Sequence, residues 1–339
     1  MAEAWENYGF GPRLHSAGSG IWGVFESFKH LPPCVLPWSG REYEEIYHSC
    51  VTIIKKVEAH AIVVEPLACQ AIDVCHSLGL KFVTLSPNSP RDIAASIQPF
   101  GSIFRYPALS SGISYPVPWY HIPKNLLLTC ALIFVVASSE KLRELDRYRQ
   151  KLGLTDTNPV FAPYKPQGHY LCPATPKTEF PCIIPENLTL CGPILPPASP
   201  LEGDRELVAW LGHAPTILVN LGTHVNMDEM GVRQLAMALR ILLDRERKVQ
   251  VIWKLRAQKE CKASLRDILG DDMDGGRVKV VDWLDIEPLA LLRHDNLVCV
   301  VNHGGANSFF EAIHAGVPQI ILPRGMTAMT MQRGLNGSV

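Results

Sequence analysis

The sequence lacks a long hydrophobic run, a strong charge of one sign and a paired cysteine motif. Its most apolar run, 126–137, is shorter than the ~20 residues that a membrane-spanning helix needs, so we expect a buried helix or one resting on a membrane surface. A net charge of −1 gives no reason to expect nucleic-acid binding. The ten cysteines include no CxxC pair and no Cys/His spacing typical of zinc sites, which predicts reduced thiols, no metal centre and a cytoplasmic protein.

The N-terminus lacks both a secretory signal and a dinucleotide fingerprint. Residues 1–11 are polar and carry two glutamates, unlike a signal peptide. Residues 18–23 spell GxGxxG, but the fingerprint needs a buried strand directly before it, and residues 12–17 have no strand pattern. We therefore expect no dinucleotide site at this end of the chain.

The sequence does contain the pattern of a βαβ unit. Residues 42–58 place apolar side chains on one helical face, at intervals of three and four. A short β-rich run follows at 61–64, then a helical pattern at 68–78, then a second strand at 80–85. A strand, a helix and a strand joined by a short crossover predict a parallel sheet.

Proline-rich segments interrupt the chain after this unit. We predict long loops at 86–123, irregular structure at 159–185 and a helical segment between them at 125–152. The prolines within 192–200 stiffen the chain and block both helix formation and strand pairing. This last segment is therefore the best candidate for a boundary between domains.

The boundary gives a first domain at 1–191, a linker at 192–205 and a second domain at 206–339. The second domain shows a clearer alternation of short apolar strands and helices, which predicts a doubly wound parallel sheet. Its predicted strands are 216–221, 249–253, 278–281, 297–301 and 319–322.

The most informative segment follows the strand at 297–301. A glycine pair breaks the strand, and a helical pattern resumes directly after it. Such a turn directs free backbone N–H groups outward at the positive end of a helix dipole, where a phosphate binds well. His303, Asn307 and Ser308 add donors there, and Glu311, one turn further on, can accept from sugar hydroxyls. Together these features indicate a site for a nucleotide-sugar diphosphate.

Several stretches of the chain resemble one known family. They are 63–67 and 85–89 in the first domain, and 218–224, 281–283 and 294–323 in the second. They resemble the UDP-glycosyltransferases of the GT-B fold, especially the fungal UDP-glucosyl/glucuronosyltransferase-like members. The resemblance implies an α/β protein with two Rossmann-like domains whose parallel sheets face a cleft. The first domain would bind the acceptor and the second the UDP-sugar.

The resemblance also implies roles for the residues of the glycine turn. His303 matches the histidine that donates to the diphosphate. Gly305, Asn307 and Ser308 match the turn that holds the phosphates. Glu311 matches the acid that binds the ribose hydroxyls.

Three further positions match the family, each with a structural alternative. Trp283 matches the aromatic residue that stacks on uracil, and the alternative is a core or interface tryptophan. Thr223 matches a hydroxyl residue near the phosphates, and the alternative is a turn former or helix N-cap. Glu65 lies where the family has an acid that orients a catalytic histidine, and the alternative is a strand-end glutamate with a structural partner.

The chain departs from the family pattern at both ends. The general-base histidine is missing, because neither His15 nor His30 follows a strand, and too few residues precede 42–58 for the opening βα units. Thr327 occupies the place of the acid that contacts the sugar, and the closing helices are absent. From the sequence we therefore expect a truncated chain in which both domains are incomplete.

The expected function is metal-independent, inverting transfer of a hexose from a UDP-sugar, without any cofactor, to a small hydroxylated acceptor. Apolar residues in the loops 86–123 and 159–185 favour a lipophilic acceptor, such as a sterol, a phenolic or another natural product. The alternative is a catalytically dead UDP-binding pseudoenzyme, or an inactive fragment. A nucleotide-sugar epimerase fits less well. The sequence leaves the oligomeric state open, and it favours a cytoplasmic protein, either free or peripheral to a membrane.

Overall fold

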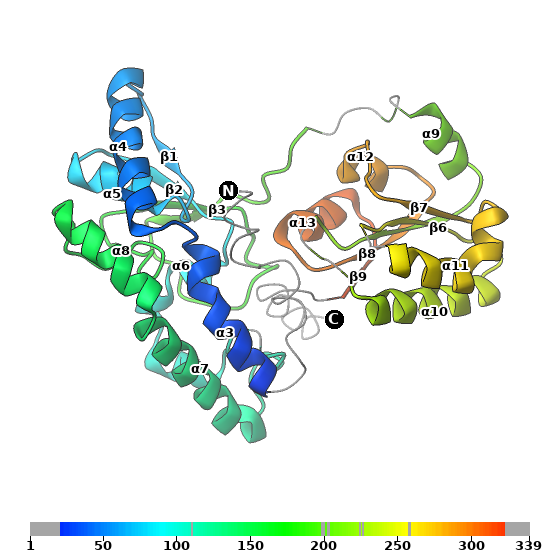
Figure 1. Ribbon diagram of the computed structural model, residues 1–339, viewed down its shortest axis with the longest axis horizontal. Helices are drawn as coiled ribbons and strands as arrows, with labels where there is room; N and C mark the ends of the chain where they lie inside the picture. Colours follow the sequence, from blue (N-terminus) through cyan, green and yellow to red (C-terminus); the bar gives the residue numbers. More distant parts are fainter. Residues whose placement is uncertain are drawn as a thin grey trace. The chain divides into compact units, whose positions relative to one another are not determined.

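The computed structural model separates into two compact units (Figure 1). The division falls between Ile194 and Leu195, within the segment 192–205 where we placed the linker. Each unit is built around one sheet, and all strand pairs among the described residues are parallel. The described residues are 21–109, 111–197, 201, 204–223, 225, 227–256 and 259–322.

Unit 1 contains a four-stranded sheet whose strands follow one another in chain order. The helix α5 (Cys69–Ser77) connects the first two strands, which pair in parallel, so the predicted βαβ unit is confirmed. The strands are β1 (Val63–Val64), β2 (Val83–Leu85), β3 (His169–Cys172) and β4 (Leu188–Leu190).

A capping box starts the long helix α4 (Gly40–Val57). The Oγ of Ser39 accepts from the amide of Glu42 at 3.2 Å, and the carboxylate of Glu42 accepts from the amide of Ser39 at 2.7 Å. Two N-terminal amides that would otherwise lack partners are thereby satisfied, which fixes where the helix begins.

The prediction of a single helical segment at 125–152 is wrong in one respect, because this segment forms two helices. Ser138 ends α7 (Ile122–Ala137), and Ser139 caps α8 (Glu140–Lys151) by accepting from the amide of Leu142. The remaining helices of unit 1 are α3 (Ile21–Val35), α6 (Pro90–Ile93) and the 3₁₀ turns η1 (Ala95–Ile97), η2 (Phe100–Phe104) and η3 (Trp119–His121).

Two further elements lie where the sequence predicted none. The strand β3 falls inside 159–185, because four residues between prolines suffice to pair with β2 and β4. The helix α3 includes part of the GxGxxG segment and continues through Pro32 and Pro33. His30 therefore lies in a helix and, as expected from the sequence, does not follow a strand.

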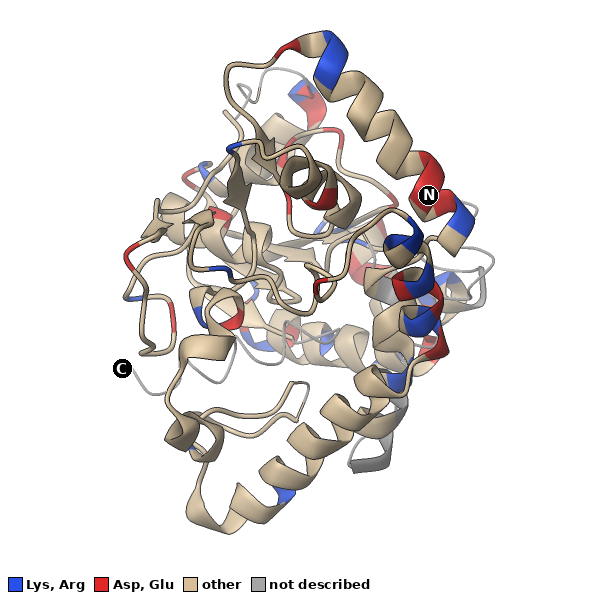
Figure 2. Ribbon diagram, turned by 90° about the vertical axis from the view of Figure 1, so that its left-hand side faces the viewer, with Lys and Arg blue, Asp and Glu red and all other residues tan. Residues whose placement is uncertain are grey.

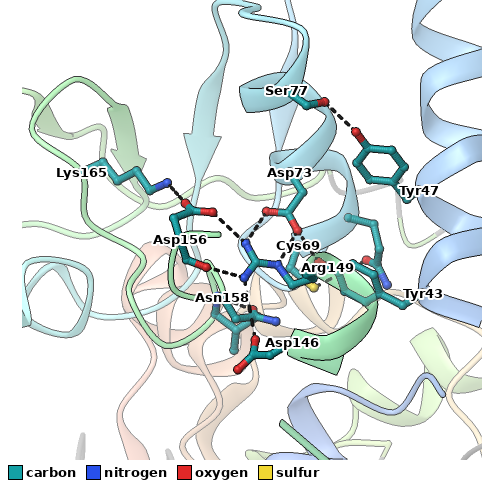
Figure 3. Close-up of polar contacts among 12 residues, drawn as sticks. Tyr43, Tyr47, Cys69, Asp73, Ser77, Asp146, Arg149, Asp156, Asn158 and Lys165 are labelled. Carbon is teal, nitrogen blue, oxygen red and sulfur yellow. Dashed lines mark hydrogen bonds and ion pairs between the residues drawn. The ribbon is translucent and has the colours of Figure 1, made fainter. Parts of the chain in front are cut away.

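A buried ion pair joins α4, α5 and α8 (Figure 3). The guanidinium of Arg149 donates to both carboxylate oxygens of Asp73, at 2.7 and 3.0 Å, and both side chains are only 1% exposed. The hydroxyl of Tyr43 donates to the same carboxylate at 2.6 Å, and Arg149 also donates to the carbonyl of Asp156 at 2.6 Å. A buried pair needs such additional partners, because its two charges lose their hydration.

Unit 2 contains a five-stranded sheet in the order β7-β6-β5-β8-β9. The strand order reverses between β5 and β8, since the chain moves from β5 to β6 on one side and later returns as β8 on the other. Its strands are β5 (Thr216–Asn220), β6 (Gln250–Lys254), β7 (Val278–Val281), β8 (Leu297–Asn302) and β9 (Gln319–Ile321), and its helices are α9 (Arg205–Leu211), α10 (Glu229–Arg245), α11 (Lys259–Asp274), α12 (Pro288–Leu292) and α13 (Ala306–Ala315).

Helices cover both faces of this second sheet. Leu218 and Val300 belong to a buried cluster with residues of α9, α12 and α13. Their chain neighbours Val219 and Val301 belong to a second cluster with residues of α10 and α11. Successive residues of a strand point to opposite faces, so the apolar runs of β5 and β8 serve two cores at once. The predicted doubly wound sheet is confirmed.

Candidate functional site

The carboxyl ends of β5 and β8 carry the same turn. Asn220 and Asn302 are paired in the strand register, and both are buried. The Oδ1 of Asn220 accepts from the amide of Gly222 at 3.1 Å, and that of Asn302 accepts from the amide of Gly304 at 2.8 Å. Both glycines have positive φ, +87° and +81°, a conformation that other residues rarely adopt. The chain therefore turns sharply after β5 and again after β8, at the same edge of the sheet. The strand order reverses at this point, which is where ligands bind in open α/β sheets.

The ring of His303 lies between two glycines at this edge. A Cβ added to Gly222 would lie 2.9 Å from Cε1 of His303, and a Cβ added to Gly305 would lie 2.7 Å from the same atom and collide with Nε2. The imidazole can occupy this position only because both neighbours lack a side chain. The half-buried ring is thereby fixed beside the start of α13.

The N-terminus of α13 has no side-chain cap. Gly305 is the N-cap residue, and the first backbone hydrogen bond of the helix runs from the amide of Phe309 to the carbonyl of Gly305 at 3.0 Å. The amides of Ala306, Asn307 and Ser308 precede that bond, so they point out of the helix at the positive end of its dipole. This arrangement suits an anionic group such as a phosphate.

Glu311 lies one turn further along α13 and is half-buried. Burial, and then the nearby carboxylate of Glu287 just before α12, raise the pKa of Glu311 above its ordinary value. Its carboxylate can accept hydrogen bonds from hydroxyl groups, and such bonds would stabilise the charge that burial disfavours.

The neighbouring turns of unit 2 present two further predicted residues. Thr223 is exposed and directly follows Gly222. Trp283, in the turn after β7, is 54% exposed and does not belong to the hydrophobic core. The Nζ of Lys254, the last residue of β6, lies 4.1 Å from the centre of the indole ring, and burial lowers the pKa of this lysine. The tryptophan is therefore held by a cation on one face.

Asn302 also fixes the position of α13. Its Nδ2 donates to Oε1 of Gln319 at 2.9 Å, and the Nε2 of Gln319 donates to the carbonyl of Phe309 at 3.4 Å. The turn, the helix and β9 are thus connected through one pair of amide side chains.

Glu65 lies at the carboxyl end of β1, in the other unit. Its carboxylate accepts from the amide of Leu67 at 2.7 Å, and its carbonyl accepts from the amide of Ala68 at 2.9 Å. Partial burial of the carboxyl raises the pKa of Glu65 despite these hydrogen bonds. These contacts are local and form the turn that leads into α5.

Sequence reasoning missed Glu179, which contacts Ser89 in the family-like stretch 85–89. The hydroxyl of Ser89, which caps α6 after β2, donates to Oε2 of Glu179 at 2.8 Å. The contact joins the two segments predicted as acceptor loops, 86–123 and 159–185. Burial raises the pKa of Glu179 to about 7. Glu179 could not be recognised from the sequence, because a single acid in a proline-rich segment belongs to no periodic pattern.

The structure thus brings Thr223, His303, Gly305 and the start of α13 together at the adjoining ends of β5 and β8. His15 and Thr327 lie outside the described residues. Among the residues that the structure describes, no group of three or more His, Cys, Asp or Glu is placed to hold a metal ion.

Comparison with protein families gives one match. Residues 160–329, half of the chain, match the family model described as UDP-glucoronosyl and UDP-glucosyl transferase. Among curated proteins, the chain is 37% identical over 290 residues to Glycosyltransferase sdnJ of Sordaria araneosa, covering 83% of this chain and 56% of that protein. It is 26% identical to the 2-hydroxyacylsphingosine 1-beta-galactosyltransferase of Mus musculus, covering 80% of this chain and 47% of that protein. The chain spans about half the length of these relatives.

Solved structures show the same fold. A UDP-glucosyltransferase from Polygonum tinctorium matches with a TM-score of 0.55 at 17% identity, over 87% of this chain and 64% of that one. A transferase from Siraitia grosvenorii in complex with UDP matches with a TM-score of 0.52 at 17% identity, over 89% and 72%. At this identity the likeness concerns the fold alone, and it confirms the predicted α/β architecture of the GT-B type.

Proposed function

This chain belongs to the UDP-glucuronosyl and UDP-glucosyl transferase family, and from that premise we propose that it binds a UDP-sugar at the ends of β5 and β8. The observation that carries the proposal is the uncapped N-terminus of α13 beside the ring of His303. Its outward amides would bind the diphosphate, and His303 would donate to the same group. Charge that develops on the departing diphosphate is stabilised by dipoles already in place, so the reaction needs neither a metal ion nor a cofactor.

We assign the nucleoside to two further residues of unit 2. Trp283 offers an exposed indole for stacking on uracil, and Glu311 offers a carboxylate for the ribose hydroxyls. Thr223 adds a hydroxyl at the end of β5, near the phosphates. Gly305, Asn307 and Ser308 form the turn between these groups.

The proposed reaction is inverting transfer of a hexose by direct displacement at the anomeric carbon. Such a reaction needs a group that accepts the proton of the attacking hydroxyl. Our candidate is Glu179, because it joins both proposed acceptor loops and its pKa of about 7 suits proton transfer near neutral pH. Glu179→Gln should lower kcat by about 100-fold with little change in the Kd for UDP. An unchanged kcat would remove Glu179 from the mechanism.

The proposed acceptor is a small, lipophilic, hydroxylated molecule such as a sterol or a phenolic. Two half-buried aromatic rings, Tyr115 and Phe180, lie with their centroids 4.6 Å apart, and Phe180 directly follows Glu179 in the chain. Aromatic faces next to a proton-accepting group suit an apolar molecule with one reactive hydroxyl. The mouse relative is named as a galactosyltransferase that acts on 2-hydroxyacylsphingosine, and this name supports an apolar acceptor.

Calorimetry with UDP tests the donor site directly. Glu311→Gln should raise the Kd for UDP at least about tenfold, because a charged hydrogen-bond acceptor is lost. The matched control is Asp267→Asn on α11, an exposed carboxylate of the same unit, which should leave the Kd unchanged. Equal affinities for wild-type protein and both variants would refute the proposed site.

The second candidate function is a UDP-binding pseudoenzyme. The observation that favours it is Thr327 in the place of the sugar-contacting acid. Transfer assays with UDP-glucose and a panel of hydroxylated acceptors separate the two functions. Binding of UDP without turnover selects the pseudoenzyme, and turnover excludes it.

A further inference from the structure

Unit 1 carries a set of exposed apolar side chains on adjoining elements that the donor site does not use. It is formed by α7 and the two 3₁₀ turns that contact it, η2 and η3. We call it the α7 surface, and its members are exposed aromatic and aliphatic side chains. They are Phe100 (83% exposed), Trp119 (81%), Tyr120 (61%), Leu127 (57%), Ile133 (62%) and Phe134 (68%).

The α7 surface is present because α7 is apolar on all sides. Its inner face packs against α3 through Leu128 and Ala131, which contact the fully buried Phe28. Its outer face repeats apolar side chains at intervals of three and four, from Leu127 to Phe134. A helix that is apolar all round requires an apolar neighbour on each side. Among the described residues, only the inner face of α7 has such a neighbour, the helix α3.

Asn125 makes this surface rigid. It is buried, and its side chain accepts from the amide of Ala108 at 2.6 Å and donates to the carbonyls of Ile103 and Tyr106 at 3.1 and 2.9 Å. These bonds hold the loop that carries η2 against α7. The exposed rings are thereby displayed on a fixed support.

The chain segment that forms this surface carries charges of one sign. No Asp or Glu occurs between residues 93 and 139, whereas Arg105 and Lys124 lie on η2's C-terminal side and at the start of α7. Figure 2 shows no acidic residue along α7. Apolar and aromatic side chains edged by cations match the boundary between the headgroups and the acyl chains of an anionic bilayer.

We propose that the α7 surface docks unit 1 on the face of a lipid bilayer that contains anionic headgroups. By length and composition alone, the segment 119–137 is the one helix among the described residues that could cross a membrane, and only 17% of it is buried. Spanning would require α7 to leave α3 and to break the hydrogen bonds of Asn125 in a medium that cannot replace them. In this proposal α7 therefore lies at the interface between the lipid bilayer and water. The expectation of a buried helix at 126–137 is wrong, and the surface-resting alternative remains.

Vesicle flotation of the whole chain tests this proposal without relying on transferase activity. Wild-type protein should float with vesicles of phosphatidylcholine and phosphatidylserine. Ile133→Gln combined with Phe134→Gln should lower the partition coefficient at least about tenfold, because two apolar side chains no longer leave water. The matched control is Met237→Gln combined with Ile241→Gln on α10, two comparably exposed residues of unit 2, which should float like wild type.

A second pair of variants tests the charge. Arg105→Gln combined with Lys124→Gln should reduce flotation with phosphatidylserine-containing vesicles to the level seen with phosphatidylcholine alone. Equal flotation of wild type and the Ile133/Phe134 variant would overturn the proposal, as would an equal loss in the α10 control. A wild-type dimer that ignores vesicles and is abolished by the Ile133/Phe134 variant would assign the surface to a second copy and overturn it too.

Discussion

At the scale of single residues, the position of the His303 ring depends on the absence of a side chain at Gly305. Gly305 has an ordinary φ of −68°, so alanine is compatible with its backbone, but the added Cβ would collide with the imidazole. Gly305→Ala should therefore displace His303 without disturbing the turn. We expect the Kd for UDP to rise by about tenfold and the Tm to change by only a few degrees.

A glycine elsewhere in unit 2 provides the control for this prediction. A Cβ added to Gly270, within α11, would meet its nearest neighbour at 3.6 Å, which is ordinary contact. Gly270→Ala should leave UDP binding unchanged and stabilise the helix slightly. If Gly305→Ala binds UDP as tightly as Gly270→Ala does, the ring of His303 has no part in donor binding.

Glu179 predicts a dependence of stability on pH. Burial raises its pKa to about 7 from an ordinary value of 4.5, so the folded state holds this proton more tightly than the unfolded chain does. The resulting stabilisation is complete below the ordinary pKa and is lost as the pH rises through about 7. Glu179→Gln should match wild type near pH 4 and be more stable at pH 8, by thermal melts at both values. A difference of equal size at both pH values would contradict this.

At the scale of elements, the attachment of α8 to α4 and α5 depends on Arg149. Arg149→Met leaves the carboxylate of Asp73 buried without its counter-ion, which should cost about 3–5 kcal/mol in the free energy of unfolding. Adding Asp73→Leu should recover part of the loss, because the unpaired charge is removed. Arg266→Met is the control, since its ion pair with Asp274 is exposed, and urea unfolding should show a change below about 1 kcal/mol. A loss below that value for Arg149→Met would show that the network contributes little.

The sequence predicted the elements whose pattern is local. The strand 278–281 has the bounds that we expected, since its apolar residues mark it directly. The strand β3 was missed because it exists only through pairing with β2 and β4, and no pattern within His169–Cys172 reveals those partners. The boundary between α7 and α8 was missed because Ser138 and Ser139 are tolerated inside helices as well as at their ends.

Part of the candidate site could also be predicted, because its sequence pattern is local. The turn at 303–308 is contiguous in sequence, so its glycines, donors and following helix could be recognised together. The contact between His303 and Gly222 could not be recognised, because these residues are 81 positions apart in the chain and meet only through the sheet register. Ser89 and Glu179 likewise meet only through the fold of unit 1.

At the scale of the whole molecule, each unit has its own sheet and its own buried clusters. We therefore expect two thermal transitions, of which UDP should raise only the one belonging to unit 2. At a UDP concentration 100 times its Kd, the stabilisation should be about 2.7 kcal/mol. Calorimetric scans with and without UDP, with hydrogen exchange to assign the transitions, measure this. An equal shift of both transitions would show that the units unfold together.

The paired asparagines at the ends of β5 and β8 bear on how such a site diversifies. Asn220 and Asn302 align the two turns through the strand register and through side-chain hydrogen bonds to the amides of Gly222 and Gly304. Asn307, in contrast, is exposed at the start of α13 and lies outside these asparagine bonds. Evolution can therefore exchange Asn307 to accommodate another sugar nucleotide while the inherited backbone cradle persists, so donor preference and cradle geometry are separately heritable traits.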